Sequence, residues 1–379
     1  MVYLDNAATS FPKPRAVREE QDRCMRLYCG NPGRSSHPIA MRAAEVIYDC
    51  RAELAALMGS NSPENVIFTS NATSAINLAL KGLLRHGDHV LLSDVEHNAV
   101  FRPLARLARD GRITYDRFPS FAVARDRSPE RILAAIASLI RPNTRLLVCT
   151  HASNICSVSM PIREIGAFCR ARGILFVVDA SQSAGHLPID MAEMCIDALC
   201  LPGHKGLFGP PGVGALLLGD GVFADTLTEG GSGVNSLDDA MPEESPERYE
   251  AGTLPVPAIA GLGAGIRLVR SIGLDEIAAR EQMLSSYLFE RLSSIRGLEI
   301  LLPHAVGPIL LCHAHRLSSD RLGSALGERG ICVRSGFHCA PLAHQTLSTP
   351  ADGAVRLSLS YFNTKSDIDS AVRALKEII

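Results

Sequence analysis

Short apolar runs alternate with longer amphipathic stretches from about residue 35 to residue 300. The apolar periodicity of a helix, about 3.6 residues, occurs in TSAINLALKGLL and PIREIGAFCRARG. Strand-like apolar runs occur in VIFTS, HVLLSD, RLLVCT, ILFVVDAS and GVGALLLG. Strands that alternate with helices favour a parallel sheet covered by helices on both faces. The pattern therefore predicts an α/β fold for this part of the chain.

The pattern changes near residue 256. The stretch VPAIAGLGAGIRLVRSIG predicts a long helix, and helical EIAARE and SYLFERLSSI follow it. A strand is expected around 308–313 and a last helix from about 365. We therefore expect a large domain over residues 15–255 and a smaller α+β domain over residues 256–379.

Composition excludes several classes of partner. The 379 residues are 46% hydrophobic with a formal net charge of −2, so the chain has a substantial core but no basic field for nucleic acid or an anionic membrane. The N-terminus lacks the pattern of a signal peptide, and no apolar run is long enough to cross a bilayer. We expect a cytoplasmic protein whose eleven cysteines stay reduced, without disulfides.

One stretch, CHAH at 312–315, contains residue types that bind metals. It follows the apolar run GPILLC, and strand alternation would place His313 and His315 on one face and Cys312 on the other. Because the usual spacing of ligands is missing, we expect a plain strand and no metal site.

Polar residues follow several of the predicted strands. In open parallel sheets ligands bind at the carboxyl ends of the strands, where Asp179 ends ILFVVD and Asn71–Ser74 join a strand to a helix. The start of that helix could bind a phosphate through its free N–H groups, although ordinary capping by Asn71 or Thr73 would also explain it. Asp179 could likewise be a helix cap.

Lys205 follows an apolar strand in LCLPGHKGLFGPPGVGAL, between glycines that let the backbone approach a ligand. Burial would favour the neutral amine, which can form a Schiff base. A lysine, a carboxylate at a strand end and a phosphate site at a helix start are together the set that pyridoxal phosphate needs.

A further residue of interest is Cys339 in VRSGFHCAPLAH, where Gly336 and Pro341 indicate a loop. A loop cysteine near His338 and Arg334 could react as a thiolate. The alternative is a small core residue, the commonest role of a cysteine.

Ten short motifs in order along the chain resemble those of the class V aminotransferase-like family of pyridoxal-phosphate enzymes, and within it those of cysteine desulfurases and selenocysteine lyases. They are YLDNAAT, NPGRSSH, SNATSAIN, DVEHNAV, HASNICSV, VVDASQSAG, GHKGLFGPPGVG, EAGTLPVPA, RSGFHCA and VRLSLSYFNT.

The resemblance implies a fold-type I homodimer that converts L-cysteine to L-alanine and keeps a persulfide on a catalytic cysteine for a sulfur-acceptor protein. It implies a large cofactor-binding domain, a small domain with the cysteine loop, and an N-terminal segment, residues 1–14, near the active site. The sequence of the motif RSGFHCA is similar to that of the short-loop group, which includes selenocysteine lyases.

The resemblance also assigns roles. Lys205 would be the Schiff-base lysine and proton carrier, Cys339 the sulfur acceptor and His97 the imidazole stacked on the cofactor. Asn154 and Arg356 would lie near the substrate carboxylate. The remaining cofactor contacts would come from Ala72, Thr73, Asp179, Gln182, His204 and, reaching the phosphate of the other subunit, Thr253.

One position departs from the pattern. Many relatives carry serine or threonine before GHK, but this chain has Pro202, which offers neither a hydroxyl nor an N–H group. Selenocysteine lyase activity, another class V lyase and a cofactor-free sulfur-relay scaffold are the alternatives that the sequence leaves open. The sulfur acceptor is not evident from the sequence.

Overall fold

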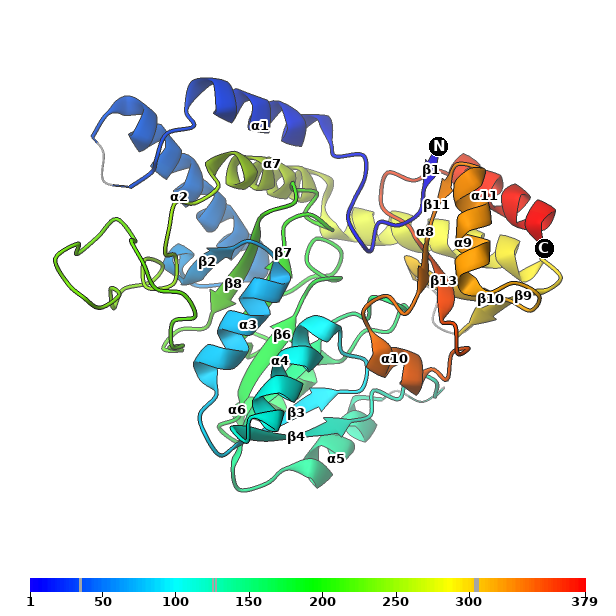
Figure 1. Cartoon of the computed structure of the whole chain (residues 1–379), viewed down its shortest axis with the longest axis horizontal. Helices are drawn as coiled ribbons and strands as arrows, with labels where there is room; N and C mark the ends of the chain where they lie inside the picture. Colours follow the sequence, from blue (N-terminus) through cyan, green and yellow to red (C-terminus); the bar gives the residue numbers. More distant parts are fainter. Residues whose placement is uncertain (34–35, 125, 127, 303–306) are drawn as a thin grey trace.

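The computed structural model describes residues 1–33, 36–124, 126, 128–302 and 307–379. Two residues of the NPGRSSH motif, 34 and 35, lie outside this part of the chain. A seven-stranded and a four-stranded sheet lie side by side, with helices packed around both (Figure 1). The predicted α/β fold, with a mostly parallel sheet covered by helices and smaller α+β elements toward the C-terminus, is confirmed.

The larger sheet contains all the strands predicted between residues 66 and 218. All neighbours are parallel except β8, which is antiparallel to both β2 and β7. The connection between β7 and β8, residues 203–213, contains no helix, and a link this short cannot return the chain for a parallel pair. In order, the strands are β2 (Val66–Thr69), β8 (Gly214–Leu218), β7 (Ala198–Pro202), β6 (Leu175–Asp179), β5 (Thr144–Thr150), β3 (Asp88–Ser93) and β4 (Ile113–Phe118).

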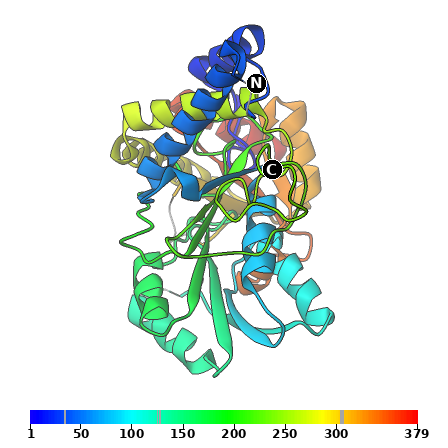
Figure 2. The ribbon, with the colours of Figure 1, turned by 90° about the vertical axis from the view of Figure 1, so that its left-hand side faces the viewer.

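Helices cover both faces of this sheet, because its strands are apolar on both sides. In β5, Leu147 packs on one helical layer and Val148 on the opposite one. Figure 2 shows the two layers on either side of the sheet. One layer has α2 (Pro38–Met58), α5 (Pro129–Leu139), α6 (Ile162–Arg170) and α7 (Val256–Ile272), and the other has α3 (Ala72–Leu83) and α4 (Asn98–Arg109). Helix α1 (Arg15–Leu27) packs on α7, and a short 3-10 helix, η1 (Pro63–Asn65), precedes β2.

The smaller sheet is antiparallel. Its strands are β12 (Arg334–Gly336), β13 (Ala354–Ser358), β10 (Ile309–Ala314) and β9 (Leu298–Leu301). The core of this part includes α8 (Leu274–Ser293), α9 (Ser319–Glu328) and α11 (Lys365–Ile378), and α10 (Pro341–Thr346) follows Cys339. The N-terminal β1 (Val2–Tyr3) pairs with β11 (Ile331–Cys332), so the start of the chain packs in the smaller part.

The packing of α7 bears on the expected domain boundary. Its residues Ile259, Leu262 and Ile266 belong to the core of the larger sheet, and the helix ends at Gly273. The division at residue 256 stays a prediction, and this packing favours a boundary near Gly273. No single helix in the described part of the chain is long and apolar enough to cross a membrane. Taken together, α7 and α8 have the length and composition of a membrane span, but the angle between them is 80°.

Candidate active site

A cavity of about 100 Å³ lies at the carboxyl ends of β5, β6 and β7, against the start of α3. It is the position at which parallel α/β sheets bind ligands. Of the site residues to which the resemblance assigns a role, eight line this cavity: Ala72, Thr73, His97, Asn154, Asp179, Gln182, His204 and Lys205. Asn71, Ala99, Thr150, Ala152, Ser181 and Pro202 complete its lining.

One end of the cavity is suited to an anion. The side chain of Asn71 caps α3 by accepting a hydrogen bond from the N–H of Ser74, and Ala72 and Thr73 form the first turn. Near this turn, His204 has a buried Nδ1 atom without a hydrogen-bond partner. An unpartnered imidazole nitrogen beside a helix N-terminus fits a phosphate group, which would satisfy both.

Lys205 and Asp179 both line the cavity. Burial lowers the pKa of Lys205 from 10.5 to about 8, and the charge of Asp179 opposes this shift. Asp179 ends β6, is 3% exposed, and accepts a hydrogen bond of 2.9 Å from the N–H of Ser181. The site therefore combines an amine that is readily neutral with a carboxylate held in place by the turn after β6.

His97 is the N-cap of α4. Its Nδ1 accepts a hydrogen bond of 3.0 Å from the N–H of Ala99, so the ring proton of the neutral imidazole is on Nε2. Burial lowers the pKa of His97, and the nearby charge of Lys205 acts in the same direction. A neutral, oriented imidazole at the cavity suits stacking on a planar ligand.

The N-terminal segment lies against the site. The side chain of Gln182 donates a hydrogen bond of 2.9 Å to the main-chain oxygen of Ala7. The main-chain oxygen of His204 accepts from Ser10 N at 3.1 Å and from Lys13 Nζ at 2.7 Å. These contacts place residues 7–13 beside the loop that carries Lys205.

Arg356 extends from β13 toward the same region and is 2% exposed. It donates to Asp5 Oδ1 at 2.7 Å and to the main-chain oxygen of Asn154 at 2.9 Å, while its Nε atom is buried without a partner. Sequence reasoning missed Asp5, although the motif YLDNAAT contains it. The unused donor leaves the guanidinium able to bind a further acceptor.

Cys339 lies outside the cavity, but its loop is hydrogen-bonded to Asn154, which lines the cavity, and to Asn98, which follows the lining residue His97. Asn98, the first residue of α4, donates its N–H to the main-chain oxygen of Cys339 at 2.8 Å. The side-chain amide of Asn154 donates to the main-chain oxygen of His338 at 2.8 Å. The thiol is exposed, and Arg334 Nη2 lies 3.9 Å from its sulfur.

A chain of side-chain hydrogen bonds runs behind Cys339. His338 Nδ1 lies 3.1 Å from His344 Nε2, and His344 Nδ1 lies 2.7 Å from the hydroxyl of Thr349. His338 Nε2 lies 3.1 Å from the main-chain oxygen of Arg334. Burial lowers the pKa of His338 to about 3 and that of His344 to about 4, so both rings are neutral near pH 7.

Thr253 is the one predicted cofactor residue that does not line the Lys205 cavity of its own chain. It is exposed and lines a different cavity, of about 580 Å³, together with Tyr48, Arg51 and Glu250. A residue that serves the other subunit of a dimer would have such a position. That role stays a prediction.

Comparison with known proteins adds the family. The sequence model of the family Aminotransferase class-V matches residues 2–371. A probable cysteine desulfurase of Methanothermobacter thermautotrophicus is 32% identical over 385 residues, which cover 100% of this chain and 94% of that protein. A cysteine desulfurase of Yersinia pestis is 32% identical over 388 residues, with 100% and 93% covered.

A solved structure agrees with these relatives. The apo structure of a cysteine desulfurase from Thermococcus onnurineus superposes with a TM-score of 0.88 at 27% identity, covering 100% of this chain and 94% of that one. The chain therefore belongs to the class-V aminotransferase family, and these relatives within it are cysteine desulfurases.

Proposed function

We propose that the protein is a pyridoxal-phosphate-dependent cysteine desulfurase that converts L-cysteine to L-alanine and leaves the sulfur on Cys339. One structural observation supports this proposal most directly. An exposed cysteine is hydrogen-bonded, through its own backbone and that of His338, to the elements that carry His97 and Asn154 beside Lys205. The names of the relatives support the same reaction.

The cavity fits pyridoxal phosphate by its donor set. The start of α3 and the unpartnered Nδ1 of His204 suit the phosphate, and Asp179 suits a protonated pyridine nitrogen. Pro202 lines the cavity without a hydroxyl, whereas Ser181, another lining residue, has one that is available to the phosphate. When bound, the cofactor supplies an electron sink for the bonds broken at the substrate.

Residues of the chain carry out the proton transfer and the attack on the substrate sulfur. Lys205, as a neutral amine, accepts the Cα proton of the substrate. The Cys339 thiolate attacks the substrate sulfur, a sulfur–sulfur bond forms, and the carbon–sulfur bond breaks with its electron pair going to carbon. After protonation of that carbon alanine leaves, and one substrate sulfur stays on Cys339 as a persulfide.

Arg356 and Asn154 orient the substrate in this proposal. The guanidinium is buried, charged and has an unpartnered Nε, which suits a carboxylate. Asn154 lines the cavity and receives a hydrogen bond from Arg356 through its main-chain oxygen. Thr253 would complete the site of a second copy, and an acceptor protein would remove the sulfur from the exposed Cys339.

The test is mass spectrometry of the Cys339 peptide after brief incubation with L-cysteine and alkylation of exposed sulfur. An added sulfur on Cys339 and one alanine per sulfur are expected. Of the chain's eleven cysteines, all in the described residues, only Cys29 and Cys339 are exposed, so Cys29→Ser is the matched control. The expected result is full activity in Cys29→Ser and none in Cys339→Ser.

Two outcomes would overturn the proposal. An unmodified Cys339 in cofactor-loaded protein that releases selenium and alanine from selenocysteine would make selenocysteine lyase the function. Pyruvate or a transamination product in place of alanine would indicate another class V reaction.

A further inference from the structure

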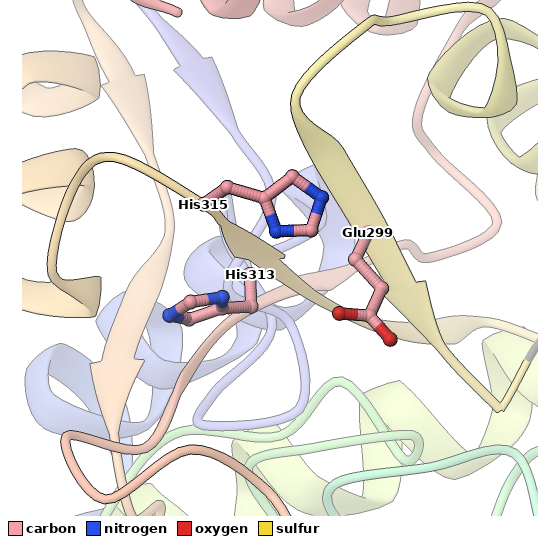
Figure 3. Close-up of side chains that lie close together, drawn as sticks. All are labelled: Glu299, His313 and His315. Atoms are coloured by element: carbon pink, nitrogen blue, oxygen red, sulfur yellow. The ribbon is translucent and has the colours of Figure 1, made fainter.

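Three side chains capable of binding a metal lie together on the smaller sheet, away from the Lys205 cavity. They are Glu299 of β9, His313 of β10 and His315, which follows β10 directly. Figure 3 shows all three close together over the two strands. One potential ligand atom of each lies within 4.8 Å of the other two.

The pairing of the strands explains this grouping. Glu299 is the direct cross-strand partner of His313, and the N–H of His315 continues the pairing by donating to Gly297 O at 3.0 Å. Residues two apart on a strand share a face, so both histidines and the glutamate project from one side. Cys312 and Ala314 are buried on the other side.

The strand arrangement expected for CHAH is thus present, and Cys312 is not part of the cluster. The sequence pattern places two ligands on one face of a strand, which is too few for a site. The third ligand, Glu299, comes from the neighbouring strand, and no sequence spacing reveals which residue of another strand lies opposite.

A carboxylate lies next to one imidazole. Asp352 Oδ1 is 3.8 Å from His313 Nε2, and Asp352 Oδ2 accepts a hydrogen bond of 2.6 Å from the N–H of Ser319. A carboxylate beside a metal-bound histidine orients the ring and makes it a better ligand. The bond to Ser319 holds that carboxylate in place.

We propose that Glu299, His313 and His315 form a binding site for a divalent transition-metal ion such as Zn²⁺. Two imidazoles and one carboxylate select zinc, nickel or copper over calcium and magnesium, which prefer oxygen ligands. Glu299 and His315 are exposed, so water completes the coordination and the ion exchanges with solvent. The site is structural: it fastens β9 to β10, the strand that pairs with Arg356 through Leu311.

The test uses cofactor-loaded protein treated with a chelator and then titrated with Zn²⁺. Because exposed thiols also bind zinc, the titration is done on protein in which both exposed cysteines are replaced, Cys29→Ser and Cys339→Ala, which leaves the cluster intact. We expect one zinc per chain. In that background, His315→Ala and Glu299→Gln should each weaken binding by at least about tenfold. His86→Ala, which removes another exposed histidine, should leave binding unchanged.

A second readout separates the site from general effects on folding. Zinc should raise the melting temperature of the protein with both exposed cysteines replaced and of its His86→Ala derivative, but not that of its His315→Ala derivative. With Cys339 intact, His315→Ala should keep the wild-type rate with L-cysteine, because the cluster is outside the cavity. Zinc affinity that is the same with and without His315, or no zinc binding once both exposed cysteines are replaced, would overturn the proposal.

Discussion

The side-chain amide of Asn154 donates a hydrogen bond of 2.8 Å to the main-chain oxygen of His338, the residue directly before Cys339. Asn154 follows β5 of the larger sheet, whereas His338 follows β12 of the smaller one. Residues 338 and 339 both have left-handed backbone angles, with φ of 52° and 56°, and such angles are unfavourable for residues other than glycine. The contact across the two sheets therefore helps to hold the cysteine loop in a conformation that it would not adopt by itself.

Replacement of Asn154 by alanine should slow persulfide formation on Cys339. The change removes a buried hydrogen bond, whose loss typically costs about 1–2 kcal/mol, so a fall of about tenfold in the rate is expected. The measurement is a single-turnover time course of sulfur on the Cys339 peptide with saturating L-cysteine.

A matched control is Asn98→Ala. The bond from residue 98 to Cys339 O comes from the main-chain N–H, which alanine keeps, so this variant should react at close to the wild-type rate. Equal rates for Asn154→Ala and wild type would show that the contact to His338 does not position the loop.

Replacement of Arg356 by lysine should weaken the preference for substrates with a free carboxylate. The guanidinium bonds to Asp5 and to Asn154 O and still has a spare Nε, a geometry that one ammonium group cannot reproduce. The ratio of kcat/KM for L-cysteine to that for cysteine methyl ester should fall at least about tenfold. The exposed Arg373→Lys should keep the wild-type ratio, and an unchanged ratio in Arg356→Lys would place the substrate carboxylate elsewhere.

Acid should destabilise the region behind Cys339. Burial lowers the pKa of His344 from 6.5 to about 4, so between these values the unfolded chain binds more protons than the folded one. Stability is therefore lost as the pH falls from 7 to 5, by about 1–2 kcal/mol from this residue. Urea unfolding at both pH values should show a smaller loss in His344→Gln than in wild type, while exposed His86→Gln should lose as much as wild type.

The sequence allowed the elements and most of the cavity to be predicted, because apolar periodicity marks strands and helices and the ends of parallel strands meet at one edge. That reasoning placed Asp179 and Lys205 together correctly. It did not predict that β8 is antiparallel to its neighbours, since an apolar run contains no information about the direction of the strand in the sheet.

Contacts between distant residues were also missed. The pairing of Asp5 with Arg356 joins positions 351 residues apart, and Glu299 lies opposite His313 only through the register of two strands. Periodicity shows which face a side chain occupies, but not which residue on another strand lies across from it.

The shifted pKa of Lys205 gives a prediction that does not need the whole reaction. Burial lowers this pKa to about 8, and only the neutral amine attacks the aldehyde of pyridoxal phosphate. Capture of the cofactor by apoprotein should therefore speed up about tenfold between pH 7 and pH 9 and then level off. Borohydride quenching followed by mass spectrometry of the Lys205 peptide measures this, with exposed Lys81 as the reference in the same sample.

Asp179→Asn tests the cause of that profile. The negative charge of Asp179 raises the pKa of Lys205 against the effect of burial, so its removal should lower the pKa further. The capture profile of Asp179→Asn should consequently shift toward acid, with a larger fraction of the maximal rate already reached at pH 7. A profile that shifts toward alkaline pH would show that the charge of Asp179 does not raise the pKa of Lys205. Labelling of Lys205 that keeps rising in parallel with Lys81 would show that burial does not lower it.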